Sequence, residues 1–232
     1  LRCSIRQSFV NRLELQVLCE GRYQTGVKIV GLPRRLQALD PLWSPDGERL
    51  ALIVVQKKRC SLWVIEASSG QARQVSRRQP QGVNGFDVEW LDSQNLLCLM
   101  VGRPGAAQTN HNVRVAPSIQ EHQKVKQTAR TYQDLLKSEQ DALELEHYLS
   151  SVPVRISLAD DCETELAAPG LYLYMNAAPG KKHLLLDSVI RPFSYSVPLT
   201  YFPRRTEVVD LAEANESSTG QLSRLVVREL PL

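Results

Sequence analysis

The sequence of 232 residues predicts a mainly β fold, a partial β-propeller of about three four-stranded blades with a helical insertion. Two observations carry this prediction. A tight turn followed by an apolar strand recurs along the chain, at a period of roughly 40 to 50 residues that is typical of four-stranded blades. A stretch near the middle of the chain departs from this pattern and takes on a helical one.

The first unit begins with the turn Ser44-Pro45-Asp46-Gly47. Proline at the second position has its backbone torsion already set for a type I turn, and serine and glycine fit the first and fourth positions. Residues 50–55 are then apolar and largely β-branched, which predicts a strand buried on both faces. Further strands are predicted at 61–66 and 71–76. The last of these is mostly polar, as expected of an outer edge that must resist pairing with other chains.

A second unit repeats the first. Trp90-Leu91-Asp92 stands where the first unit has Trp43-Ser44-Pro45-Asp46, and the runs 86–93 and 95–101 both have strand character. A third turn, at 176–182, precedes the apolar run 183–187. It comes about two periods after the second turn, so either a degenerate blade or an insertion lies between them.

The insertion is expected where hydroxyl residues are followed three positions later by an acid, because the hydroxyl caps a helix and the acid reaches back to it. These pairs are Thr131 with Asp134 and Ser138 with Asp141. One face of the second helical segment carries Ala142, Leu145 and Leu149. The predicted organisation is a poorly defined N-terminal segment (1–31), propeller blades (32–104), a loop and helical insertion (105–151) and one or more further blades (152–232).

Composition limits the classes of partner. The net charge is only +3 and the basic doublets are scattered, so no nucleic-acid partner is expected. No run approaches the roughly 20 apolar residues of a membrane helix, so no membrane partner is expected either. The five cysteines are odd in number and far apart, which argues against a disulfide framework. A soluble protein of a reducing intracellular compartment is therefore predicted.

Catalytic and metal-binding motifs are missing from the sequence. No Gly-x-Ser-x-Gly elbow is present, although a hydrolase of the α/β type needs one to expose its nucleophile. Glu144 and His147 have a spacing used in helical metal sites, but there is no second copy of the pair, so a solvent-facing helix surface is preferred. Paired cysteine motifs and glycine-rich phosphate loops are absent too, and no metal or other cofactor is predicted.

Two long segments are recognisable, "ARTYQDLLKSEQDALELEHYLSS" and "PGLYLYMNAAPGKKHLLLDSVIRPFSYSVPLTYFPRRTEVVDL". They resemble the amino-terminal propeller of the prolyl oligopeptidase superfamily of serine peptidases, in the branch of plastid and bacterial glutamyl endopeptidases. The matching motifs are residues 131–136, 191–195 and 202–205. The family's usual Ser-Pro-Asp-Gly turn is replaced here by Ala177-Ala178-Pro179-Gly180.

The resemblance implies a peptidase whose catalytic α/β-hydrolase domain lies carboxy-terminal to the propeller in the parent chain and is its partner. It also implies the plastid stroma or the cytoplasm as the compartment. No catalytic residue is therefore expected in this chain, which is expected to be inactive alone and to gate the access of peptide substrates. Arg191, Arg204 and Arg205 lie in or beside a segment that is rich in proline and expected to be a rigid loop. Their guanidinium groups are candidates for binding a substrate glutamate, with a solvated surface loop as the alternative. A stand-alone propeller scaffold without activity is the alternative function.

Overall fold

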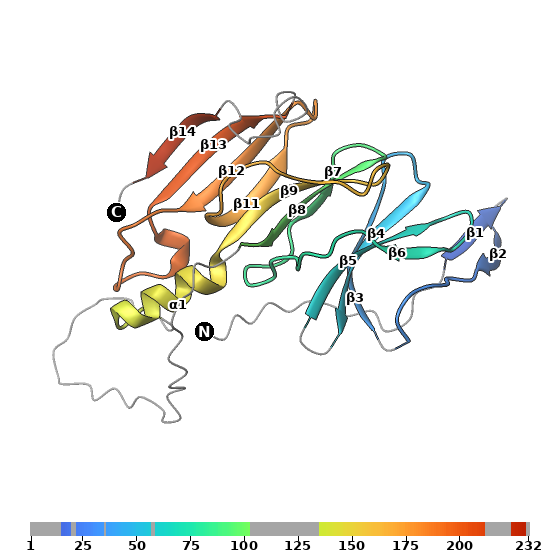
Figure 1. Ribbon diagram of the computed structural model, residues 1–232, viewed down its shortest axis with the longest axis horizontal. Coiled ribbons are helices and arrows are strands. Elements are labelled where there is room, and N and C mark those ends of the chain that lie inside the picture. Colours follow the sequence, from blue (N-terminus) through green and yellow to red (C-terminus); the bar gives the residue numbers. More distant parts are fainter. Residues whose placement is uncertain are drawn as a thin grey trace.

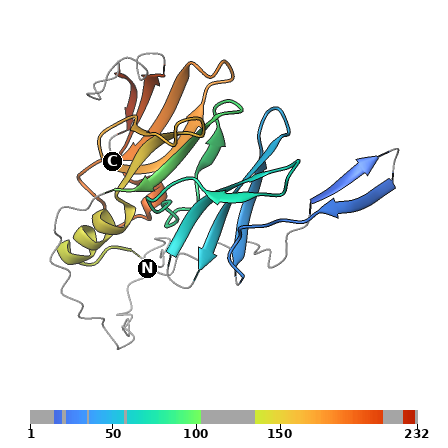
Figure 2. The same cartoon turned by 45° about the vertical axis from the view of Figure 1, so that its right-hand side comes forward.

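The computed structural model describes residues 15–19, 22–34, 36–56, 59–102, 135–211 and 224–230. These residues form three four-stranded antiparallel sheets, one α-helix and a two-stranded hairpin (Figure 1). The hairpin, β1 (Leu15–Cys19) with β2 (Arg22–Val27), projects away from the three sheets in Figure 2. The three sheets stack side by side without closing a ring.

Each four-stranded sheet is built from consecutive strands in chain order, which is how a propeller blade is connected. The first sheet contains β3 (Gln37–Trp43), β4 (Arg49–Gln56), β5 (Arg59–Glu66) and β6 (Ala72–Gln74). The second contains β7 (Val88–Trp90), β8 (Asn95–Val101), β9 (Ser151–Ser157) and β10 (Glu163–Glu165). The third contains β11 (Leu171–Ala177), β12 (His183–Val189), β13 (Arg204–Asp210) and β14 (Arg224–Leu230). The prediction of a mainly β, partial propeller is confirmed.

The turn that opens the first unit forms as predicted. The Gly47 N–H donates to the Ser44 carbonyl at 2.9 Å, and Gly47 has φ +74°, a left-handed conformation that glycine adopts without strain. The Ser44 hydroxyl donates to Asp46 at 2.5 Å, and this bond is the main reason that the pKa of Asp46 is lowered to about 2. The turn thereby fixes the start of β4.

The central strands are buried on both faces, as predicted for residues 50–55. In β4, Ala51 and Ile53 point toward the second sheet, while the alternate residues join a separate apolar cluster on the other face. In β8, Leu96 and Cys98 face the first sheet and Leu97 faces the third. An uninterrupted apolar run is therefore what a strand between two sheets requires.

The helical insertion interrupts the second sheet. Strands β8 and β9 pair from Asn95 with Ser157 to Val101 with Ser151, so the chain leaves the sheet after β8 and returns to the same sheet. Of the two alternatives left by the spacing of the turns, the insertion is the one observed. Helix α1 (Glu139–Leu149) belongs to it. The Asp141 N–H donates to the Ser138 hydroxyl at 3.2 Å, which confirms Ser138 as the N-cap.

The buried face of α1 is also the predicted one. Its buried residues are Ala142, Leu145 and Leu149. The acid reaches back one residue farther than expected, because Asp141 accepts the backbone N–H of Lys137 at 2.8 Å. The other predicted helix start, at Thr131 and Asp134, lies outside the described residues.

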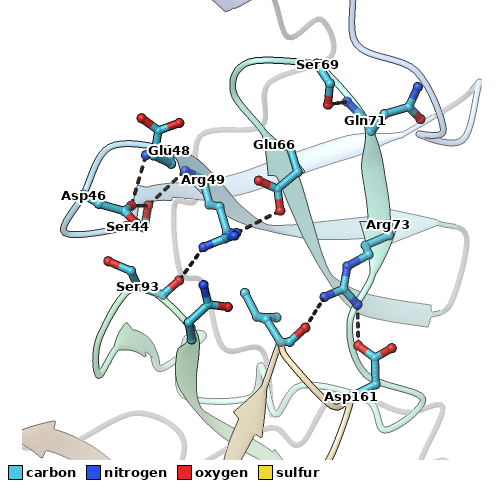
Figure 3. A network of polar contacts seen from close by, with 12 residues as sticks. Ser44, Asp46, Glu48, Arg49, Glu66, Ser69, Gln71, Arg73, Ser93 and Asp161 are labelled. Atoms are coloured by element: carbon cyan, nitrogen blue, oxygen red, sulfur yellow. Dashed lines mark hydrogen bonds and ion pairs between the residues drawn. The ribbon is translucent and has the colours of Figure 1, made fainter.

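The first and second sheets meet in a seam with an apolar centre and a charged edge. Trp90 is buried in the centre, and its indole N–H donates to the Leu42 carbonyl at 2.9 Å. At the edge, Arg73 of β6 donates to Asp161 at 2.5 Å and to the Leu158 carbonyl at 2.9 Å (Figure 3). Side chains of the first sheet thus hold the turn between β9 and β10.

The same seam has two further polar links. Arg49 lies within the first sheet beside Glu66, at 2.8 Å, and also donates to the Ser93 carbonyl of the second sheet at 2.8 Å (Figure 3). Arg78 donates to Glu165 of β10 at 2.7 Å. In the ion pairs described at this seam, the cations are Arg49, Arg73 and Arg78, which belong to the first sheet or directly follow it.

The free face of the first sheet is covered by the segment that precedes it. Ile29, Leu32 and Leu36 pack on the apolar cluster of β4 and β5. The Val30 N–H donates to the Gly70 carbonyl at 2.9 Å, and the Ala72 N–H donates to the Val30 carbonyl at 2.8 Å. This segment therefore hydrogen-bonds to the chain at the start of β6 while it covers the sheet.

Candidate functional site

The proline-rich segment lies between β12 and β13, where sequence analysis placed the candidate substrate site. Its ends are joined by the Ile190 N–H, which donates to the Pro203 carbonyl at 3.0 Å. Between them the chain forms a loop with one short 3-10 helix, Leu199–Tyr201. The prediction that proline prevents strand pairing here is confirmed, because β13 begins only at Arg204.

The loop and the insertion helix share an apolar core. The rings of Phe193 and Phe202 stack with centroids 5.6 Å apart, and both residues are buried. Leu145 and Leu149 of α1 belong to the same cluster. The helix is therefore fixed to the third sheet through this loop, beside the sheet end seen in Figure 1.

Arg191 binds carboxylates of α1. Its Nε donates to Glu146 at 2.6 Å and its Nη1 donates to Glu139 at 3.3 Å, while the guanidinium lies 4.9 Å from the centroid of the Phe193 ring. The hydrogen bond with Glu146 raises the pKa of Arg191 above its already high value. Tyr195 donates to Glu139 at 3.2 Å. Arg191 thus clamps the helix to the loop.

Arg204 and Arg205 occupy successive positions on β13, so their side chains leave opposite faces of the third sheet. Arg204 donates to Asp187 of β12 at 2.9 Å and to the Thr200 carbonyl at 3.4 Å. The structure therefore does not bring the three predicted arginines together as one cationic cluster. Arg191 and Arg204 each pair with a carboxylate of this chain, and Arg205 also has interactions of its own.

A second group of charged residues lies at the seam between the second and third sheets. Asp87, just before β7, accepts the Met175 N–H at 2.6 Å, and Glu89 accepts the Ala177 N–H at 2.9 Å. Lys181 forms an ion pair with Glu89. These two carboxylates satisfy backbone donors of β11 that face away from β12, and so they join two edge strands that do not pair directly.

Sequence analysis assigned no role to this group. The signal was the alternation Phe86-Asp87-Val88-Glu89-Trp90, which places two acids on one side of an otherwise apolar strand. Burial is the main cause that raises the pKa of Asp87 to about 6. A cavity of about 330 Å³ adjoins Asp87, between the loop before β7, the end of α1 and β11.

The described residues contain no cluster of three or more histidine, cysteine or acidic side chains able to hold a metal ion. Among them there is also no helix long and apolar enough to cross a membrane. Cys60, Cys98 and Cys162 are free thiols. Burial raises the pKa of the Cys98 thiol far above its ordinary value, so this residue is an inert part of the core.

Three stacked antiparallel meanders of four strands define the class of the protein, an open β-propeller portion. No protein-family model matches the chain. The chain is 30% identical over 215 residues to the probable chloroplastic glutamyl endopeptidase of Arabidopsis thaliana, which is 88% of this chain and 22% of that protein. The protein of the same name from Oryza sativa subsp. japonica is 30% identical over 214 residues, 88% of this chain and 23% of the relative.

These similarities confirm the sequence-based resemblance to glutamyl endopeptidases, and the chain spans less than a quarter of the length of either relative. Among solved structures, TolB from Acinetobacter baumannii is 13% identical with a TM-score of 0.44, covering 91% of this chain and 36% of TolB. The propeller domain of the Trilobed protease from Pyrococcus furiosus is 12% identical with a TM-score of 0.43, covering 83% of this chain and 43% of that one.

Proposed function

We propose that this chain is the non-catalytic propeller portion of a glutamyl endopeptidase-like serine peptidase and that it gates the access of peptides to an α/β-hydrolase domain. The observation that carries the proposal is the 30% identity to named glutamyl endopeptidases across 88% of the chain. The described residues supply stacked sheets for such a gate. Peptide substrates and the hydrolase domain are the partners this function requires.

Gating of this kind is steric. A propeller selects by the width of the passage between its sheets, so the seams must be stiff enough to exclude folded substrates. The buried Trp90 and the polar links of Arg73 and Arg78 stiffen the seam between the first and second sheets. Weakening those links is therefore the direct way to test the gate.

The test compares substrates of one cleavage sequence in the full-length polypeptide. One substrate is a short peptide, and the other is a folded protein that carries the same sequence in a surface loop. We expect the short peptide to be cleaved and the folded protein to be spared. In the double variant Arg73→Gln, Arg78→Gln, cleavage of the folded substrate should rise while kcat/KM for the peptide stays unchanged.

The matched control is Arg77→Gln, an exposed arginine between the two, which should alter neither substrate. Cleavage of the folded substrate by the unmodified protein, or an equal change of both substrates in the double variant, would contradict the gate. Hydrolysis by this chain alone would contradict its non-catalytic role. A full-length polypeptide with no peptidase activity would favour the stand-alone scaffold instead.

The substrate-binding role of Arg191, Arg204 and Arg205 remains a prediction. A substrate glutamate that binds Arg191 has to displace Glu139 or Glu146, which already accept its hydrogen bonds. The test is Arg191→Gln and, separately, Arg204→Gln in the full-length polypeptide, with peptides that differ only in Glu or Gln at the cleavage site. An unchanged preference for Glu would remove the electrostatic role.

We also propose a reducing compartment, the plastid stroma or the cytoplasm. Cys60, Cys98 and Cys162 are free thiols, and the two curated relatives are named as chloroplastic. Subcellular fractionation with an antibody against the chain tests this. Recovery in a secreted fraction would contradict it.

A further inference from the structure

Asp87 and Glu89 are two carboxylates in equivalent positions, but their surroundings differ. They lie two residues apart along one strand, so both side chains point to the same side. Each accepts one backbone N–H from β11, and the two donors, Met175 and Ala177, are also two residues apart. The geometry of one carboxylate is therefore a guide to what the other can bind.

Glu89 has a cationic partner. One of its oxygens accepts the Ala177 N–H, and the other accepts a hydrogen bond from the ammonium group of Lys181. Asp87 has only the first half of this arrangement. Its Oδ2 accepts the Met175 N–H, and no donor of the described residues is recorded for its other oxygen.

The missing partner matters because Asp87 is half-buried. The pKa of its carboxyl is raised to about 6, mainly by burial; the hydrogen bond from Met175 lowers it, the nearby Glu89 raises it, and no cation contributes. A carboxylate with this environment gains more from a cation than an exposed one does, since the attraction is less screened.

The space beside Asp87 is large enough for a small group. The cavity measures about 330 Å³, at the lower end of the roughly 300 to 1,000 Å³ of ligand pockets. Phe86 and Tyr172 contribute aromatic surface to it, and aromatic rings attract cations. Asp87 is the one residue with a formal charge among the described residues of the lining.

The polar amides of the lining are already engaged. Gln81 donates to the carbonyls of Tyr148 and Ser150 at 2.9 and 3.0 Å. Asn84 donates to the Leu173 carbonyl at 3.0 Å. These bonds hold the end of α1 and β11 around the cavity, and they leave Asp87 as the group that recognises a ligand.

We propose that this cavity binds a primary ammonium group against Asp87, in the way that Lys181 is bound by Glu89. The ligand class is a primary amine, supplied either by a lysine side chain or by the free amino terminus of a peptide. This site is separate from the steric gate, since it requires neither a hydrolase domain nor cleavage.

The experiment is a calorimetric titration of the full-length protein with three small amides. Nα-acetyl-lysine methylamide presents a side-chain ammonium, alanyl-alanine amide presents a terminal one, and Nα-acetyl-norleucine methylamide is the uncharged counterpart. We expect at least one amine to bind about tenfold more tightly than the norleucine compound, a difference that calorimetry resolves. Whichever of the two amines binds more tightly shows whether the site takes a lysine side chain or a free amino terminus.

The Asp87→Asn variant should lose this preference. Asparagine keeps a side-chain oxygen for the Met175 N–H, so the fold is retained and a thermal unfolding curve checks this. Glu89→Gln is the matched control and should change amine affinity by no more than about twofold, because that residue does not line the cavity.

The proposal is overturned if the norleucine compound binds as tightly as the amines, if amine affinity is unchanged in Asp87→Asn, or if the loss is equal in Glu89→Gln. The last result would mean that the seam, and not the contact with Asp87, controls binding. Absence of binding by both amines would overturn it as well. Every outcome leaves the gating experiment unaffected, so the two proposals fail independently.

Discussion

The two seams between the sheets are built differently. The seam between the first and second sheets has an apolar centre that contains Trp90. At its edge near β6 and β10, the last strands of the two sheets, arginines bind carboxylates and a carbonyl. Between the second and third sheets, Asp87 and Glu89 bind backbone N–H groups on the side of the first strands. Ion pairs thus join the sheets at both seams, but at the second seam carboxylates also bind backbone N–H groups of the neighbouring sheet.

The charged side chains of the two seams also differ in how far they are exposed to water. The side chains of the Arg73–Asp161 pair are 42% and 70% exposed, so water and salt weaken their attraction. Asp87 is half-buried, and this burial is the main cause that raises its pKa. The first seam is therefore expected to respond to salt and the second to pH, while the apolar centres supply most of the stability of both.

The largest effect is expected from the apolar centre of the first seam. Trp90→Ala should lower the free energy of unfolding by about 3 to 5 kcal/mol, because it removes a buried aromatic side chain and leaves a cavity. Trp90→Phe should cost less, since it removes the hydrogen bond to Leu42 and only part of the volume. Urea unfolding measures both, and equal losses would contradict the importance of packing.

The next effect concerns the pH response of the second seam. The folded pKa of Asp87 is about 6, above the roughly 3.9 of an unfolded aspartate, so the folded state binds more protons between these values. The free energy of unfolding should therefore fall as pH rises from about 4 to about 6, by up to about 3 kcal/mol from this group. Asp87→Asn should remove that fall and leave the protein more stable at pH 7. A pH series of urea unfolding that is identical in both proteins would contradict this.

A smaller effect is expected from the ion pair between Lys181 and Glu89 at the same seam. Lys181→Met leaves Glu89 without its cation and should cost about 1 kcal/mol at neutral pH, since both side chains are partly exposed. Lys182→Met is the matched control, because the neighbouring Lys182 is exposed and forms no ion pair within the described part of the chain. Thermal unfolding should separate the two variants. A loss as large in the control would show that the charge of the turn, and not the ion pair, is responsible.

The smallest effect is expected at the charged edge of the first seam. Arg73→Gln should cost at most about 1 kcal/mol, and the cost should shrink at high salt because the pair with Asp161 is exposed. Urea unfolding at low and high salt measures this. An effect that is larger than that of Lys181→Met, or independent of salt, would reverse the comparison of the two seams.

The sequence predicted the parts of the fold that rest on neighbouring residues. The Ser44–Gly47 turn, the apolar run of β4, the cap at Ser138 and the buried face of α1 are local patterns, and all of them are observed. Strand β9 was not predicted. It contains Pro153 and pairs with β8 across the whole insertion, so nothing near it in the sequence identifies its partner.

The candidate site shows the same limit. The loop character of residues 190–203 follows from its prolines, but the ion pairs of Arg191 join residues 45 and 52 positions apart. The contacts of Asp87 with Met175 and of Glu89 with Lys181 span 88 and 92 positions. Contacts of this range depend on how the sheets stack, and a single sequence does not specify that stacking.

The covering of the first sheet gives the stack a direction. Ile29, Leu32 and Leu36 already occupy the face of that sheet that is turned away from the second. On the third sheet, Leu185 and its strand partner Val208 alternate with the buried residues of the seam and are only half-buried. In the described part of the chain, the outer apolar face of the first sheet is thus already occupied by the chain itself, whereas the outer face of the third sheet is the one with room for a further packing partner.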